Sequence, residues 1–361
     1  MLADQGWRHA VLLPLGGLLG LALYHAAFGF TAAYRNMMVR RDVAGVQAQL
    51  VMLAAVTVLF APALAEGTLL GRSLTGAVAP LGVQVMAGAL MFGLGMQLGG
   101  GCGSGTLFTL GGGSPRMVLT LAAFCAGSFA ASLHMQWWVT TPRLPGLALG
   151  QALGWTPALV VQLTLLALLW FGLRRWGRAA GPDDSLRKIS WRRLLAGPRP
   201  LVWGALALAI LNWLTLVITG HPWTITWAFT LWGAKAAQVL GWDPAGVWFW
   251  TGGFTENALN SSLLGDETSV MNAGIVVSAF GAAAAAGRLA PVFRVPAASL
   301  AAALIGGLLM GYGARIAFGC NIGAFFSGVA STSLHGWLWL GCALAGTWIG
   351  IRLRPLFGLA N

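Results

Sequence analysis

The sequence predicts an all-α polytopic membrane protein, in which about nine transmembrane helices form an inverted repeat with broken or re-entrant half-helices. Two observations predict this fold class. Of the 361 residues, 57% are apolar and 8% are charged, whereas charged residues make up about 25% of a soluble domain. In addition, one stretch of glycine and cysteine occurs twice in the chain at a constant offset.

The repeated stretch has the same layout in both halves of the chain. Each copy has a Gly-x-Gly pair near the end of an apolar segment, then a glycine-cysteine loop, then an apolar stretch too short to cross a bilayer. This layout indicates a helix that breaks inside the membrane, and paired interrupted helices mark the substrate site of a transporter. The predicted substrate pathway therefore contains Gly101, Cys102, Gly103, Ser104 and Gly105 of the first loop and Gly319, Cys320, Asn321 and Gly323 of the second.

The other apolar runs supply the membrane spans. We expect crossings at residues 11–30, 43–61, 77–98, 116–134, 156–173, 201–219, 268–287, 297–318 and 334–351. Two short runs, 31–42 and 223–232, are weakly similar to each other and are expected to be half-helices. Residues 136–155 are expected to be a loop. Residues 241–267 have no counterpart in the first half, and we expect a further re-entrant piece there.

Basic residues between the spans predict the orientation. The net charge is +12, but the basic residues form no patch with interleaved aromatics, so we expect no nucleic-acid partner. Positive loops favour the cytoplasm, and the most basic stretch is Arg174 to Arg199. We therefore expect a multi-pass protein of the bacterial plasma (inner) membrane, with its amino terminus outside and its carboxyl terminus in the cytoplasm. The first apolar run has no cleavage-site pattern and is expected to remain as a span.

This orientation divides the chain into two halves and a connection. Residues 1–135 form the first half, residues 136–200 a connecting span with a basic cytoplasmic loop, and residues 201–361 the inverted second half. The two glycine-cysteine loops then enter the membrane from opposite faces. We expect them to bring Cys102 and Cys320 close together near the midplane, without a bond between them, at a thin central barrier.

The four cysteines fall into two twinned pairs. A buried cysteine usually packs as a small hydrophobe, but Cys102 and Cys320 lie beside glycine at a helix break. There, S–H groups and the free N–H groups of a half-helix start can donate to an anion without a permanent charge that would trap it. Cys125 and Cys342 lie within apolar segments, and packing is their favoured interpretation. We expect no metal and no cofactor, because the sequence has no CxxC pair, metal-ligand spacing or Walker motif.

Several polar residues near the loops have two interpretations each. Ser104 and Thr106 either cap the following half-helix or touch the anion. Arg315 either attracts the anion at the outer mouth, or it extends to the membrane interface or pairs with Glu256. Lys235 has the same two interpretations, a role toward the anion or an interfacial one. Arg35 is interpreted as a cytoplasmic anchor.

These loops resemble the YeeE/YedE family of sulfur-compound transporters, also called the sulfur-transport domain family. The resemblance is carried by Gly99 to Gly105, Gly319 to Ala324 and Trp232 to Lys235, together with the pattern of spans. It implies inward passage of thiosulfate or a related sulfur-containing anion, relayed by the thiols of Cys102 and Cys320. Some members have a further cysteine on the amino-terminal half-helix, where this chain has Phe28 to Thr31 and no cysteine.

Other functions remain open at this point. A membrane thiol oxidoreductase needs two thiols within disulfide reach and a partner cofactor, and a passive channel needs a continuous polar lining. The loops consist mostly of Gly, Ala and Phe. A transporter, rather than an enzyme, is therefore the favoured interpretation, with another sulfur or selenium species as the alternative substrate. Its expected partners are the anion, the lipid bilayer and, as a candidate, a cytoplasmic sulfur-carrier protein.

Overall fold

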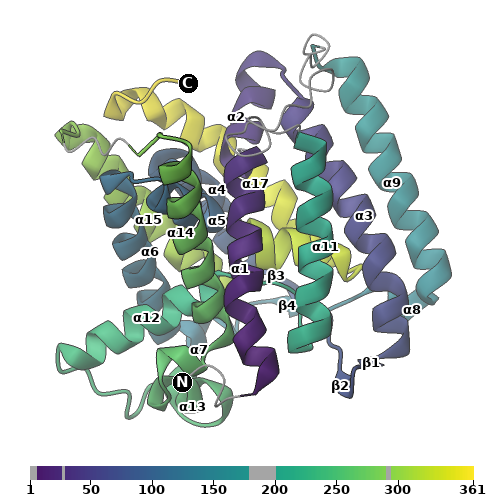
Figure 1. Ribbon diagram of the computed structural model, residues 1–361, viewed down its shortest axis with the longest axis horizontal. Helices are drawn as coiled ribbons and strands as arrows, with labels where there is room; N and C mark the ends of the chain where they lie inside the picture. The colour runs from purple at the N-terminus through teal and green to yellow at the C-terminus, as the bar shows by residue number, and fades with distance from the viewer. Residues whose placement is uncertain (1–5, 27–28, 179–200, 290–293) are drawn as a thin grey trace.

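A computed structural model describes residues 6–26, 29–178, 201–289 and 294–361. Within these ranges, nine helical stretches are long and apolar enough to cross a membrane, which confirms the prediction of an all-α polytopic membrane protein with about nine spans. Most of the basic stretch Arg174 to Arg199, and Phe28 on the amino-terminal half-helix, lie outside the described residues. The start of the first helix and the carboxyl end of the chain lie at opposite ends of the molecule (Figure 1).

The spanning stretches are each built around one long helix. Their boundaries agree with the predicted spans to within a few residues, because continuous apolar runs of this length carry a strong signal. The helices are α1 (Trp7–Ala26), α3 (Ala44–Glu66), α4 (Val83–Gly99), α6 (Pro115–Leu133), α9 (Trp155–Trp176), α11 (Leu201–Thr219), α14 (Glu267–Ala285), α15 (Ala297–Ile316) and α17 (Leu334–Leu353).

Four short elements lie between the long helices, as the two repeated loops and the two weak half-helix signals predict. They are α2 (Phe30–Arg40), α5 (Gly103–Gly111), α12 (Thr226–Val239) and a π-helical segment, η5 (Asn321–Phe326), which continues into α16 (Ser327–Ala330). Helix α2 lies toward the end of the molecule that holds the carboxyl terminus, and α12 lies toward the opposite end (Figure 1).

The connecting segments contain more structure than the sequence predicts. Residues 136–155, expected as a loop, contain part of α7 (Met135–Trp138), strand β4 (Arg143–Leu144) and α8 (Leu149–Leu153). β4 pairs antiparallel with β3 (Leu81–Gly82), and β1 (Thr68–Leu69) pairs antiparallel with β2 (Arg72–Ser73). The register places Leu81 opposite Leu144 and Thr68 opposite Ser73. These short pairings satisfy backbone groups where the chain turns at the helix ends.

Residues 241–267 differ from the predicted re-entrant piece. They form two short 3-10 turns, η3 (Trp248–Trp250) and η4 (Leu263–Gly265), on either side of α13 (Gly253–Asn260). The segment is mostly exposed and lies at the end of the molecule where α1 begins (Figure 1). Its polar residues explain the difference, because exposed polar side chains are more stable at an aqueous face than within the bilayer.

Close helix packing builds the centre of the molecule. α15 packs against α6 and α4, and α17 packs against α4. The first glycine of each repeated stretch makes this possible: a side chain at Gly93 would collide with the carbonyl of Ala343 on α17, and one at Gly311 with the carbonyl of Phe124 on α6. Small residues at such contacts let membrane helices approach closely.

The outer helices also pack in pairs, each formed by one helix from either half of the chain. α1 packs against α14, and α3 packs against α11. A final helix, η6 (Arg354–Phe357), follows α17 directly. α9 packs mainly on α3, and most of its side chains are exposed, as expected for a helix that faces lipid.

Candidate functional site

The two predicted cysteines occupy equivalent positions at the starts of the short helices. Cys102 is the N-cap residue of α5, and Cys320 is the N-cap residue of η5. Their backbones have nearly the same extended conformation, with φ and ψ of −85° and −168° at Cys102 and −99° and −165° at Cys320. Both side chains are buried, and both are free thiols. The repeated sequence therefore produces a repeated local structure.

Glycine makes each turn into the short helix possible. Gly100 has a φ of +88° and Gly319 a φ of +147°, a region that L side chains with a Cβ rarely adopt. At Gly319, an added Cβ would also lie 2.7 Å from the backbone nitrogen of Ala324. Gly101 is similarly crowded, because an added Cβ there would lie 3.1 Å from the backbone of Gly105.

The first turn of each helix directs its backbone toward the thiol. The Ile322 amide donates to the Cys320 sulfur at 3.4 Å, and the Ser104 hydroxyl lies 3.4 Å from the Cys102 sulfur. The Thr106 hydroxyl instead donates to the Cys102 carbonyl at 2.9 Å. Of the two hydroxyls with open interpretations, Ser104 therefore faces the thiol, while Thr106 is engaged within its own helix.

The two glycine-cysteine loops are in contact with each other. A Cβ added at Gly103 would lie 3.1 Å from the Cys320 sulfur and 3.5 Å from the Thr226 methyl group of α12. Gly105 faces its own cysteine, with an added Cβ 3.6 Å from the Cys102 sulfur. Glycine at position 103 thus leaves room between the second thiol and the start of α5.

A group of buried polar atoms without hydrogen-bond partners surrounds the loops. These atoms are the Tyr34 hydroxyl and the Thr31 hydroxyl, both on α2, and both polar atoms of the Asn321 carboxamide. The Tyr34 hydroxyl faces the Asn321 carboxamide without the geometry of a full hydrogen bond, and it lies near Cys102. Buried polar groups are almost always hydrogen-bonded in folded proteins. Several such atoms at one place therefore indicate a site whose partner is a ligand or water.

An aromatic row runs beside this polar group. The Phe30 ring lies 6.3 Å from the ring of Phe325, which stacks on Trp339 with centroids 6.4 Å apart. Trp339 in turn contacts Phe92 of α4 at 5.4 Å. All four side chains are almost completely buried. They supply an aromatic wall beside the site, in which the buried indole N–H of Trp339 also has no hydrogen-bond partner.

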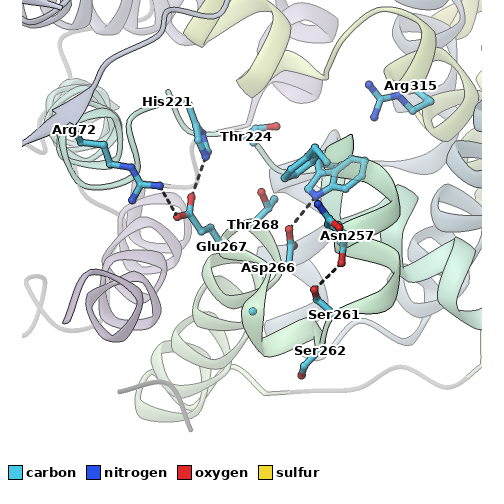
Figure 2. A pocket seen from close by; sticks show the side chains of 14 residues that line it. Arg72, His221, Thr224, Asn257, Ser261, Ser262, Asp266, Glu267, Thr268 and Arg315 are labelled. Carbon is cyan, nitrogen blue, oxygen red and sulfur yellow. Dashed lines mark hydrogen bonds and ion pairs between the residues drawn. The ribbon is translucent and has the colours of Figure 1, made fainter. Parts of the chain in front are cut away.

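A cavity of about 580 Å³ is lined in part by residues of β2, α13 and the start of α14. Both β2 and α13 lie at the end of the molecule where α1 begins (Figure 1). Figure 2 shows Arg72, His221 and Glu267 on one side and Arg315 on the other. Thr224 lines the cavity, and an added Cβ at Gly323 would lie 3.3 Å from the Thr224 hydroxyl. Thr224 therefore lies between the cavity and the second glycine-cysteine loop.

Arg315 occupies the buried side of this cavity. Its guanidinium lies 5.2 Å from the centre of the Phe249 ring, and its Nε has no hydrogen-bond partner. Among the described residues, no ion pair joins Arg315 to Glu256, whose carboxylate accepts from the Gly252 amide at 2.6 Å. The structure therefore favours the mouth of the cavity over an interfacial ion pair for Arg315.

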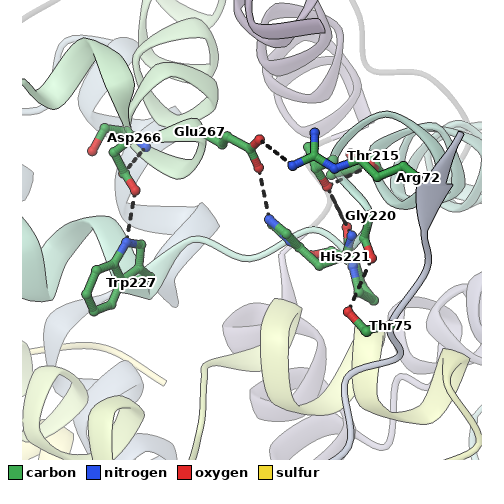
Figure 3. A network of polar contacts seen from close by, with 11 residues as sticks. Arg72, Thr75, Thr215, Gly220, His221, Trp227, Asp266 and Glu267 are labelled. Atoms are coloured by element: carbon green, nitrogen blue, oxygen red, sulfur yellow. Dashed lines mark hydrogen bonds and ion pairs between the residues drawn. The ribbon is translucent and has the colours of Figure 1, made fainter. Parts of the chain in front are cut away.

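A polar network forms the opposite wall (Figure 3). Glu267 lies 3.0 Å from the His221 imidazole and 3.7 Å from Arg72. Burial lowers the pKa of His221, but the hydrogen bonds to Glu267 and to the Pro222 carbonyl outweigh it and leave the pKa above its ordinary value. Nearby, the Trp227 indole donates to Asp266 at 2.9 Å. Sequence analysis did not identify this network, whose members are distant in sequence.

The remaining predicted residues lie apart from the cysteine loops. Lys235 donates to the carbonyls of Leu259 and Ser261 at 2.7 Å each, so it anchors the exposed segment after α12. Cys125 lies on α6, where its backbone carbonyl abuts Gly233, and Cys342 lies on α17. Both are partly buried and pack against the core. In the described part of the chain, no group of His, Cys, Asp or Glu is arranged to hold a metal ion.

Comparison with known proteins gives the same family as the resemblance. Two thiosulfate transporters named TsuA match nearly the whole chain. That of Spirochaeta thermophila is 28% identical over 93% of this chain and 96% of its own length, and that of Escherichia coli K12 is 25% identical over 95% and 94%.

A shorter match is more similar. The probable transporter YedE of Escherichia coli K12 is 35% identical, over 47% of this chain and 41% of its own length. The match thus spans less than half of that relative. The model of the sulphur transport family matches residues 25–349. The chain therefore belongs to the sulphur transport family.

Proposed function

We propose that this protein is a transporter, and not an enzyme, that carries thiosulfate or a closely related sulfur-containing anion through a central pathway between Cys102 and Cys320. The observation that carries the proposal is the cluster of buried, unpartnered polar atoms around the two contacting loops. Thiols, a phenol and a carboxamide can donate hydrogen bonds to an anion without a fixed positive charge. Such a site can therefore bind the anion and still release it.

The packing of the helices supports an inverted repeat. If residues 1–135 and 201–361 are inverted halves, then α4 corresponds to α15 and α6 to α17. The contact between α6 and α15 is then repeated as the contact between α17 and α4. In the same way, the contact between α1 and α14 is repeated as the contact between α11 and α3. Inverted repeats with broken helices place a substrate site near the midplane, where we place Cys102 and Cys320.

The orientation follows from the basic loops. We propose a bacterial inner-membrane protein whose carboxyl terminus is cytoplasmic, so that the cavity lined by Arg315 faces outward. An anion would then meet Arg315 first, pass Thr224 and Gly323, and reach the cysteine loops. Arg315 would attract the anion at the cavity, and the uncharged groups of the cysteine loops would let it pass. The TsuA relatives are named as thiosulfate transporters, which favours thiosulfate as the substrate.

A growth assay tests the substrate. The protein is expressed in a bacterium that lacks its own thiosulfate uptake, and growth is measured with thiosulfate, sulfate or a selenium compound as the supplied source. We expect rescue on thiosulfate. A matched strain that carries the empty vector sets the background. Absence of rescue on thiosulfate, with the protein shown to be in the membrane, would contradict the proposal.

A further inference from the structure

Three arginines from distant parts of the chain converge on the carboxyl end of α4. Arg116, at the start of α6, donates to the carbonyls of Leu98 at 2.6 Å and Gly99 at 2.8 Å. Arg354 of η6 donates to the Gln97 carbonyl at 2.6 Å. Arg35 of α2 reaches the Gln97 side chain at 3.5 Å. Together these residues form what we call the arginine cluster.

The positive charge of the arginine cluster is not balanced by carboxylates. In the residues that the structure describes, no aspartate or glutamate carboxylate lies within ion-pair distance of Arg35, Arg116 or Arg354. Arg35 and Arg116 are close enough to Arg354 to repel it. The end of a helix carries only about half a negative charge. The cluster therefore keeps a net positive potential.

Arg35 has donors to spare. A guanidinium has five N–H donors, and within the described residues Arg35 makes one long hydrogen bond, to the Gln97 side chain. Arg116 and Arg354 are more fully engaged, since Arg116 also donates to Ser299 and Arg354 to Ala360. Arg35 is thus the member most able to bind a ligand, while the other two hold the potential and the helix end in place.

The arginine cluster lies next to the first cysteine loop. A Cβ added at Gly100 would lie 2.5 Å from Nη1 of Arg116. The Gln97 amide donates to the Thr31 carbonyl at 3.0 Å, which joins the cluster to the first turn of α2 and its unpartnered hydroxyls. Arg116 also lines a cavity of about 400 Å³ together with Phe108 of α5. An anion that leaves Cys102 toward this side therefore meets positive charge and open space.

The second half of the chain has an arginine in a similar place. Arg315 lies in the last turn of α15, the helix that leads to the second cysteine loop, and it lines the outer cavity. In the repeated stretch it takes the position that Gln97 has in the first half. Each helix that leads to a cysteine loop thus ends beside arginine.

We propose that Arg35, Arg116 and Arg354 form a second anion site, where the transported oxyanion is held after it passes Cys102 and before it is released on the cytoplasmic side. This inference rests on the proposed transport function. Guanidinium groups match the oxygens of tetrahedral oxyanions, because their forked N–H donors can bind two oxygens at once, which a point charge such as that of lysine cannot do. The site accepts sulfate as well as thiosulfate, because it binds through oxygen.

Transport from the two faces tests this site. Initial rates are measured with labelled thiosulfate in whole cells, for the outer face, and in inside-out vesicles, for the inner face. We expect Arg35→Gln to raise the half-saturating concentration at the inner face by about tenfold and to leave that at the outer face unchanged. Arg35→Lys should restore part of the difference.

A matched control and a clear contradiction exist for this experiment. Arg352→Gln removes a charge from the last turn of α17, close to Arg354 in the chain. The Arg352 guanidinium lies 3.3 Å from the centre of the Trp348 ring, and its substitution should change neither half-saturating concentration. The proposed site would be contradicted if Arg35→Gln and the wild type had equal half-saturating concentrations at the inner face. It would also be contradicted if the substitution raised the half-saturating concentration equally at both faces. A wild-type protein that carries no thiosulfate would instead overturn the proposed function.

A binding measurement keeps the two failures separate. Sodium sulfate is added to the purified full chain in detergent, with sodium chloride at equal ionic strength as the reference, and the melting temperature is recorded. Ligand binding to the folded state raises it. We expect a rise for the wild type and for Cys102→Ala, and a smaller one for Arg35→Gln. The same rise in Arg35→Gln as in the wild type would contradict the arginine cluster as an anion site.

Discussion

The Tyr34 hydroxyl and the Thr57 hydroxyl are both buried but differ in their partners. The Tyr34 hydroxyl makes no hydrogen bond of good geometry and only faces Asn321, whereas Thr57 donates to the Leu53 carbonyl at 2.7 Å and accepts from Gln162 at 2.8 Å. An unpartnered buried hydroxyl costs stability, and a bonded one contributes about 1 kcal/mol. We therefore propose that the Tyr34 hydroxyl is kept for the anion and the Thr57 hydroxyl for the stability of the fold.

Substitution of the two residues should therefore have opposite effects. We expect Tyr34→Phe to keep or raise the melting temperature and to slow thiosulfate uptake by roughly tenfold, because it removes a donor to the anion. Thr57→Val should lower the melting temperature and retain uptake per folded molecule. Thermal melting and uptake at matched expression measure both. Full uptake in Tyr34→Phe would remove this residue from the pathway.

His221 provides a prediction of pH dependence. Its pKa is raised above the ordinary value of 6.5 by Glu267 and the Pro222 carbonyl, against the effect of burial. The stabilisation is therefore complete below pH 6.5 and is lost as the pH rises through the higher pKa of the folded state. Because 42% of the side chain is exposed, solvent screening keeps the effect small.

The measurement compares melting temperatures of the wild type and His221→Gln across this pH range. The wild type should lose stability relative to the variant as the pH rises from about 6 to 8. Parallel curves for the two proteins would show that folding does not raise the pKa of His221.

Helix contacts depend on glycine at some positions and not at others. A side chain at Gly311 of α15 would collide with α6, whereas the Cβ of alanine at Gly341 of α17 would meet nothing within 4 Å. Overpacking a close contact costs about 1–3 kcal/mol, while Gly→Ala in an open helix position gains about 0.5–1 kcal/mol.

We therefore expect Gly311→Ala to lower the melting temperature or the yield of folded protein, and Gly341→Ala to keep or raise both. Size-exclusion chromatography and thermal melting in detergent follow the two variants in parallel. Tolerance of Gly311→Ala with an unchanged melting temperature would contradict the close α6–α15 contact.

The sequence predicted the helices better than the contacts among them. Long apolar runs specify a span by length alone, so the nine spans followed directly. The repeated glycine-cysteine loops also revealed Cys102 and Cys320 as equivalent helix starts. Tyr34 was missed because its counterpart in the second half, Phe229, has no hydroxyl, so the repeat did not mark it.

The arginine cluster was missed for a different physical reason. Arg35, Arg116 and Arg354 each follow the bias of positive residues toward one face, and that bias explains each of them separately. Only the fold places all three at the end of α4. Residues 241–267 were expected to be a re-entrant piece because they have no counterpart in the first half, although their polar side chains favour the aqueous face.

The whole molecule has a predicted orientation that fusions can test. Reporter proteins at residue 185 and at the carboxyl terminus should both report the cytoplasm, while a fusion at the amino terminus should report the outside. The basic loops carry this prediction. An external signal from either of the first two positions would reverse or dismantle the inverted-repeat arrangement.

The central claim is that the anion crosses between the two cysteine loops. Uptake of labelled thiosulfate by single alanine variants of the four cysteines, at matched membrane expression, tests it most directly. Loss of a hydrogen bond to a charged species costs about 1.5–3 kcal/mol, which slows a rate-limiting crossing by roughly ten- to a hundredfold. We expect this loss in Cys102→Ala and Cys320→Ala, and little change in Cys125→Ala and Cys342→Ala. Wild-type uptake in either of the first two variants would contradict the claim.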